Sequence, residues 1–190
     1  MFYRGQEEAP FQLLVAVILM TFVIIVGLRA MEQADEQKCF YETDKAMDDL
    51  RLAIENTAQN KTPSIVNFNP PGCTKNESFV LRKSDDERIC KNACLNSSTS
   101  CVLLRYSTSE VTGIQDKCVN ISYDTQFWNS TDHSAECVDM SNQDFKPAEM
   151  ERSYIVDESN LAGLELGQYY FGYFDDPSRS FPAVCVYIKD

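Results

Sequence analysis

The sequence predicts an α+β protein in which a long N-terminal helix, transmembrane at first and amphipathic afterwards, precedes a disulfide-rich, β-containing C-terminal head. Three observations support this prediction. Residues 11–28 form a charge-free apolar run, residues 29–59 place apolar side chains on one helical stripe, and eight cysteines all follow the run. The head is therefore expected over residues 61–190, and a chain of 190 residues suits one compact domain with an appendage.

The apolar run at residues 11–28 is long enough to cross a bilayer. A helix of this length covers about 27 Å, close to the thickness of the hydrocarbon core. Thirteen of the residues are Leu, Ile, Val or Phe, and only Gln12 and Thr21 are clearly polar. A retained membrane helix is favoured over a cleaved secretory signal, because Arg29 and Glu32 follow the run where small residues would be needed. A buried core helix remains the alternative.

The amphipathic stretch follows directly, with no proline or glycine between Met31 and Gln59. Its apolar residues recur at steps of seven, three, four and four, which places them on one face of a helix. These residues are Phe40, Met47, Leu50, Ile54 and Ala58. One continuous helix is expected, and the alternative is two helices with a break near Gly27 or Cys39.

The head begins after the turn signals Thr62-Pro63 and 69–72. Ser84-Asp85-Asp86-Glu87 matches a capping box, with Ser84 as the N-cap, and predicts a short helix from Asp85 to Leu95. Cys90 and Cys94 then lie on one face of that helix, so they are expected to pair elsewhere and not with each other.

Strand signals in the head come from β-branched and aromatic residues between turn-forming residues. The stretch at residues 124–148 is polar and is expected to be rich in loops, held by Cys137. The strands are expected at Cys101–Tyr106, Lys117–Tyr123 and Met150–Val156, with a hairpin formed by Tyr169–Phe174 and Ala183–Lys189. The aromatic residues of the hairpin are expected mainly in the core.

The cysteines favour a disulfide framework, because their number is even and no C-x2-C pair suggests zinc. Their connectivity stays open, since eight cysteines allow 105 pairings. The alternative is free thiols in a reducing compartment. The cysteines are Cys39, Cys73, Cys90, Cys94, Cys101, Cys118, Cys137 and Cys185.

Asn-x-Ser/Thr sequons agree with an oxidising compartment, because they are acceptors for N-glycosylation. The sequons are at Asn60, Asn76, Asn96, Asn120 and Asn129. The expected topology has the N-terminus in the cytoplasm, one membrane span, and the residues from about 30 onward outside the cell.

The composition argues against several classes of function. Seventeen Lys and Arg against 29 Asp and Glu give a net charge of −12, which disfavours nucleic acid as a partner. The single histidine, His133, is expected in a loop, and Asp175-Asp176 is expected to form a turn. The sequence offers no phosphate-binding loop, nucleophile elbow or metal-ligand spacing, so no catalytic residue, metal or cofactor is expected, and no enzymatic activity.

The first ten residues carry a resemblance to a known family. Arg4-Gly5-Gln6 precedes the apolar run, with Pro10 at its edge. This resembles the class III signal peptide of archaeal type IV pilin-like proteins. The resemblance implies a leader of residues 1–5, cut after Gly5 on the cytoplasmic side by a prepilin-type peptidase, and a retained long helix over residues 6–60.

The resemblance also implies a fold and a function. The family combines a long N-terminal helix with a β-rich head. Its helix anchors the subunit in the membrane and then packs against other pilin subunits in the core of a filament. The residues expected in that filament core are Phe11, Leu13, Leu14, Val17, Ile18, Phe22, Ile25 and Leu28.

The expected function is therefore a structural subunit, major or minor, of an extracellular type IV pilus-like filament at the cell surface, with adhesion as a further role of the head. The alternative is a single-pass, membrane-anchored surface protein with a ligand-binding ectodomain. The two differ at Gly5, because a filament subunit should be cut there.

Overall fold

The computed structural model describes residues 8–73, 77–95, 100–108, 115–128, 137, 143–147, 164–174 and 180–189. The chain divides into two compact units, Met1–Tyr41 and Glu42–Asp190. Several sequence-based expectations lie outside the described residues: the motif Arg4-Gly5-Gln6, the strand Met150–Val156, the turn Asp175-Asp176, His133, and the sequons at Asn76, Asn96 and Asn129.

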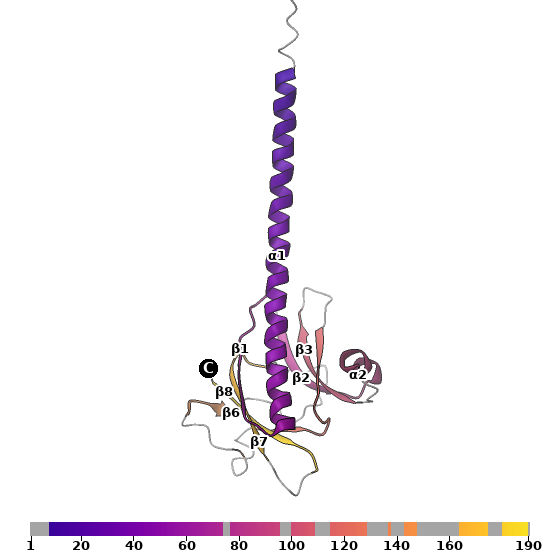
Figure 1. Cartoon of the computed structure of the whole chain (residues 1–190), viewed down its shortest axis with the longest axis vertical. Coiled ribbons are helices and arrows are strands. Elements are labelled where there is room, and N and C mark those ends of the chain that lie inside the picture. Colours follow the sequence, from indigo (N-terminus) through magenta and orange to yellow (C-terminus); the bar gives the residue numbers. More distant parts are fainter. Residues whose placement is uncertain are drawn as a thin grey trace, which may run out of the picture. The chain divides into compact units, whose positions relative to one another are not determined.

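One helix, α1, runs from Glu8 to Asn60 and contributes to both units (Figure 1). It is helical at Gly27 and at Cys39, so the alternative of two helices broken near either residue is wrong. A single glycine costs a helix only about 1 kcal/mol, and the many good helix formers around Gly27 offset that cost. The prediction of an α+β chain with a long N-terminal helix is confirmed.

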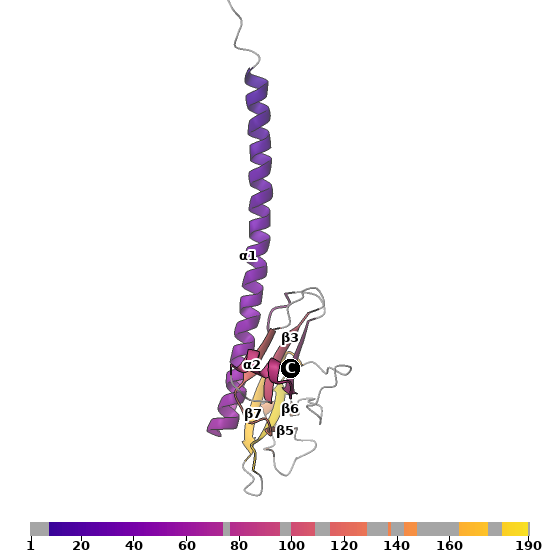
Figure 2. The same cartoon turned by 90° about the vertical axis from the view of Figure 1, so that its right-hand side faces the viewer.

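The second unit begins within α1, at Glu42, and buries four residues of the expected stripe, whereas Phe40 lies in the first unit and is partly buried. Met47, Leu50 and Ile54 are at most 1% exposed, and Ala58 is also buried. Thr57 lies on the same face, where its hydroxyl donates to the Ala53 carbonyl at 3.0 Å and so needs no outside partner. These turns of α1 lie beside the strands of the head in both views (Figures 1 and 2).

A five-stranded sheet forms one part of the head, with strand order β1-β7-β8-β5 and β6 paired to β8. The pairing is antiparallel except between β5 and β8, which run parallel. The strands are β1 (Ser64–Phe68), β5 (Gln126–Trp128), β6 (Lys146–Pro147), β7 (Gly167–Phe174) and β8 (Ala183–Lys189). The predicted hairpin corresponds to β7 and β8 and is confirmed.

A second, three-stranded antiparallel sheet has the order β2-β3-β4. Its strands are β2 (Ser78–Ser84), β3 (Cys101–Ser107) and β4 (Gln115–Val119). The two sheets meet where Phe68 of β1 packs edge-on against Phe79 of β2, with ring centroids 5.1 Å apart. Tyr106 of β3 continues this aromatic contact at 5.1 Å from Phe79.

The strand predictions need three corrections. The strand expected at Lys117–Tyr123 is instead β4, which ends at Val119, because the Ile121 amide turns back to the Val119 carbonyl at 2.9 Å. The stretch expected to be only loop-rich, 124–148, contributes the short strands β5 and β6 to the larger sheet. The strands β1 and β2 were not predicted, whereas β3 confirms the strand expected at Cys101–Tyr106.

The short helix α2 runs from Glu87 to Cys94, and its N-cap is Asp86. The Asp86 carboxylate accepts from the amides of Arg88 at 2.8 Å and Ile89 at 3.4 Å. The prediction of Ser84 as N-cap is therefore wrong. Ser84 is the last residue of β2, paired opposite Cys101, so the chain is still extended there and the cap falls two residues later.

Three disulfides join elements of the head: Cys90–Cys101, Cys94–Cys118 and Cys137–Cys185. Cys39 and Cys73 are disulfide-bonded as well, so none of the eight cysteines is free. The disulfide framework and the separate pairing of Cys90 and Cys94 are confirmed, and the free-thiol alternative is wrong.

Candidate functional site

The apolar part of α1 is the largest exposed hydrophobic feature described in the first unit. Each of its expected filament-core side chains is at least 48% exposed in the isolated chain. Monomeric soluble proteins rarely expose apolar patches of this size. The helix is long and apolar enough to cross a membrane, by length and composition. It therefore needs a covering of lipid or of other apolar helices.

This helix has the character of a membrane anchor, and the disulfides of the head are typical of an extracellular domain. A helix that is apolar on all sides is stable in lipid. It can also pack against copies of itself, because lipid tails and aliphatic side chains are equally apolar.

In the head, α1 is attached to β4 along one flank. Lys117 of β4 places its ammonium group 2.7 Å from Asp44 and 2.8 Å from Asp48, two acidic residues one helical turn apart. The Lys117 side chain is only 13% exposed. Gln115 of the same strand also donates to the Asp44 carboxylate, at 2.5 Å. This group of polar contacts fixes the helix on the three-stranded sheet.

The same flank continues past the end of β4, at Asn120. The Asn120 amide donates to the Glu55 carboxylate at 2.8 Å, and the Asn120 carbonyl accepts from the Gln59 side chain. Glu55 and Gln59 are again one helical turn apart. Both backbone groups of Asn120 are thus held by α1, while the Asn120 side chain is exposed.

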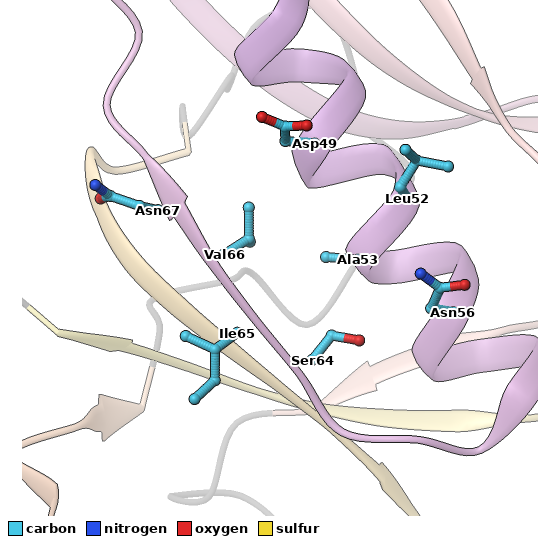
Figure 3. A pocket seen from close by; sticks show the side chains of 8 residues that line it. All are labelled: Asp49, Leu52, Ala53, Asn56, Ser64, Ile65, Val66 and Asn67. Carbon is cyan, nitrogen blue, oxygen red and sulfur yellow. The ribbon is translucent and has the colours of Figure 1, made fainter.

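The opposite flank of α1 carries an open groove of about 480 Å³ beside β1 (Figure 3). Leu52 and Ile65, both exposed, supply its apolar surface, and Asp49 supplies a carboxylate. Because β1 stands at the end of the larger sheet, it is an edge strand. The groove is lined by Asp49, Leu52, Ala53, Asn56, Ser64, Ile65, Val66 and Asn67. Sequence reasoning missed this groove, since it arises only when β1 is placed beside α1.

The aromatic residues of β7 divide between two environments. Tyr169 and Phe171 are buried, which agrees with the expected core role, and their rings stack 5.7 Å apart. Tyr170 and Phe174 are half-buried and pack on the cluster around the Cys137–Cys185 disulfide. Burial raises the pKa of Tyr169, and the charge of Glu165 adds to the rise.

A smaller polar cluster lies between the end of β2 and the segment after β4. Lys83 stands 5.1 Å over the ring of Tyr123. Desolvation lowers the pKa of Lys83, and Asp124 opposes that shift. A hydrogen bond to Asp85 raises the pKa of Tyr123. Within the described part of the chain, no three His, Cys, Asp or Glu residues are grouped so that they could hold a metal ion.

Two of the predicted glycosylation sequons are described. Asn60 is the last residue of α1, and its side-chain amide donates to Asn56 at 3.1 Å. Asn120 follows β4 and is exposed. The two sequons therefore differ in backbone conformation although both asparagines are exposed.

Comparisons with models of protein families, with curated proteins and with solved structures give no significant match. Function is therefore inferred from the residues and geometry of this chain.

Proposed function

We propose that this chain is a structural subunit of an extracellular type IV pilus-like filament. The observation that carries the proposal is the apolar segment of α1, residues 11–28, which has no charge and no covering in the isolated chain. In the proposed cycle, this segment first anchors the subunit in the membrane and then packs against the same segment of neighbouring subunits. The transfer costs little, because one apolar surrounding replaces another.

The head supports a structural role because it packs around the C-terminal turns of α1, from Glu42 to Asn60. The buried stripe of α1 lies in the core of the head, and Lys117 and Asn120 hold one flank of the helix. Disulfides within the head reduce the freedom of its unfolded chain, which suits exposure outside the cell. Adhesion by the exposed surface of the head is part of the same proposal.

The proposed processing supplies the first test. Mass spectrometry of the protein from its own cells should find a mature terminus at Gln6, after removal of residues 1–5. An intact Met1 would contradict the filament proposal and favour the alternative, a single-pass anchor with a ligand-binding ectodomain. A terminus beyond Leu28 would contradict both, because the working protein would then lack the apolar helix.

A matched pair of variants tests whether processing leads to assembly. Gly5→Val should block the cut, so that the subunit stays in the membrane fraction and is lost from filaments sheared off the cells. Gly72→Ala is the control, because a methyl group at the exposed Gly72 meets no atom within 4 Å. Equal recovery of both variants in the sheared fraction would reject the proposal.

A further inference from the structure

We infer that Asn120 is an N-glycosylation acceptor in the folded head and that Asn60, which has the same motif, is not. This inference requires the head to lie outside the cell but does not require a filament. Its basis is the different geometry of the two sequons, Asn120-Ile121-Ser122 and Asn60-Lys61-Thr62.

Asn120 is at the apex of a tight turn. The Ile121 amide donates to the Val119 carbonyl at 2.9 Å, which closes a three-residue turn centred on Asn120 at the end of β4. The backbone amide and carbonyl of Asn120 are both directed to α1, where Glu55 and Gln59 bind them. The side chain is left exposed, so a large saccharide can be attached without moving the helix or the strand.

The acceptor hydroxyl of this sequon is accessible too. Ser122 is exposed, and its hydroxyl accepts a long hydrogen bond of 3.3 Å from the Asp124 amide. A second turn follows at once, since the Thr125 amide donates to the Ser122 carbonyl at 3.0 Å. The whole motif therefore lies in surface turns, the setting in which this motif is an acceptor.

Asn60 has the opposite geometry. Its side-chain nitrogen, the atom that would be glycosylated, donates to Asn56 within the last turn of α1. The next residue, Lys61, has a left-handed backbone with φ of 57°. Pro63 then restricts Thr62 to extended conformations. Glycosylation of Asn60 would therefore have to break this bond, at a backbone that is helical and not in a surface turn.

The reaction is a group transfer from a lipid-linked oligosaccharide phosphate at the outer face of the membrane. A bond forms between Nδ2 of Asn120 and C1 of the first sugar. The bond between C1 and the phosphate oxygen breaks, and the lipid phosphate leaves with the electron pair. Nδ2 loses one proton to the solvent or to a base of the transferase, so no oxidant or reductant is needed.

Glycopeptide mass spectrometry of the full chain from its own cells tests the inference. Trypsin should release residues 52–61, which contain Asn60, and residues 118–152, which contain both Asn120 and Asn129, because Pro147 blocks cleavage after Lys146. Further cleavage after Tyr123 separates the last two sequons. We expect a saccharide mass on the fragment with Asn120 and the unmodified mass for residues 52–61. Asn120 without a saccharide, or a saccharide on Asn60, would overturn the inference.

Two variants at Ser122 give a matched control. Ser122→Ala should abolish the saccharide at Asn120, because the motif loses its hydroxyl. Ser122→Thr should retain it. Both variants leave Asn120 in place, and an intact Cys94–Cys118 disulfide in each would show that the neighbouring fold is preserved. A saccharide that persists at Asn120 in Ser122→Ala would also overturn the assignment to this motif.

Discussion

The ammonium group of Lys117 is bound twice by one residue of α1, since it lies 2.7 Å from the Asp44 carboxylate and 3.1 Å from the Asp44 backbone carbonyl. It thereby joins the smaller sheet to the helix at both a charged and a main-chain group. The lysine side chain is mostly buried, whereas its acidic partners are partly exposed to solvent. Removal of the lysine should therefore weaken the attachment of the helix, while the two acids stay solvated.

Lys117→Met should therefore lower the free energy of unfolding by about 1–2 kcal/mol, the range for lost hydrogen bonds to charged groups after allowance for solvent screening. Urea denaturation of the full chain in detergent measures this change. Lys45→Met removes the same charge from an exposed position of α1 and should change the stability by about 0.5 kcal/mol or less. Equal effects of the two substitutions would contradict a special role for Lys117.

The disulfides should differ in their contribution to stability according to the chain that they enclose. Cys137–Cys185 spans 48 residues, and Cys90–Cys101 spans 11. In the chain-entropy model, these loops correspond to about 4 and about 3 kcal/mol. Replacing the Cys137–Cys185 pair by alanines should thus be the more destabilising change in urea. If removal of Cys90–Cys101 is instead the more destabilising change, native packing around Cys90 outweighs the difference in loop entropy.

Alkaline pH should destabilise the head, and Tyr169 should contribute to this effect beside Tyr123. The raised pKa of Tyr169 means that the buried phenol stabilises the fold fully below the ordinary value of 10.0, and that this stability is lost as pH rises above it. The slope for one such group is about 1.4 kcal/mol per pH unit. Lys83 has the opposite effect on stability, because its lowered pKa makes the free energy of unfolding rise with pH. This effect ends at pH 10.5, the ordinary pKa of lysine.

Tyr169→Phe should reduce the decline in unfolding free energy measured above pH 10.5. At neutral pH it should cost about 1 kcal/mol, since the Tyr169 hydroxyl donates to the Glu165 carbonyl at 2.9 Å. The control is Tyr41→Phe, at an exposed tyrosine of the first unit, which should leave the decline unchanged. The same alkaline slope in Tyr169→Phe as in the parent chain would refute this assignment.

A charge in the apolar run should disturb membrane insertion. Leu19→Lys places an ammonium group near the middle of residues 11–28 and should disfavour insertion by about 3 kcal/mol. The share of protein that resists alkaline carbonate extraction should fall. The control is Glu32→Lys, which lies beyond the apolar run. It changes the net charge by two, against one for Leu19→Lys, yet it should leave the fraction of protein in the membrane unaltered. Full retention of Leu19→Lys in the membrane would contradict a spanning role for this segment.

Much of the architecture was predictable because it depends on local patterns. The charge-free run and the stripe through Met47 and Ile54 specify α1 by periodicity alone. The hairpin of β7 and β8 has dense β-branched and aromatic residues on both sides of a polar stretch of sequence. The Cys90 and Cys94 spacing predicted two separate disulfides, because residues one helical turn apart share a face.

The remaining elements depend on partners far along the chain. β5 has only three residues and is held by parallel pairing to β8, which no local signal indicates. β2 has three consecutive buried residues, Phe79 to Leu81, so it lacks the alternation typical of a strand. The groove needs Leu52 and Ile65 to meet from different elements, and each residue alone resembles an ordinary exposed side chain.

The position of β8 in its sheet has a consequence for biosynthesis. This strand pairs with β5, β6 and β7 and is buried from Ala183 to Ile188, yet it is the last element that the structure describes. During synthesis, the larger sheet cannot close until residues 183–189 have emerged from the ribosome. Cys137 therefore cannot form its native disulfide until Cys185, near the end of the described chain, has been synthesised.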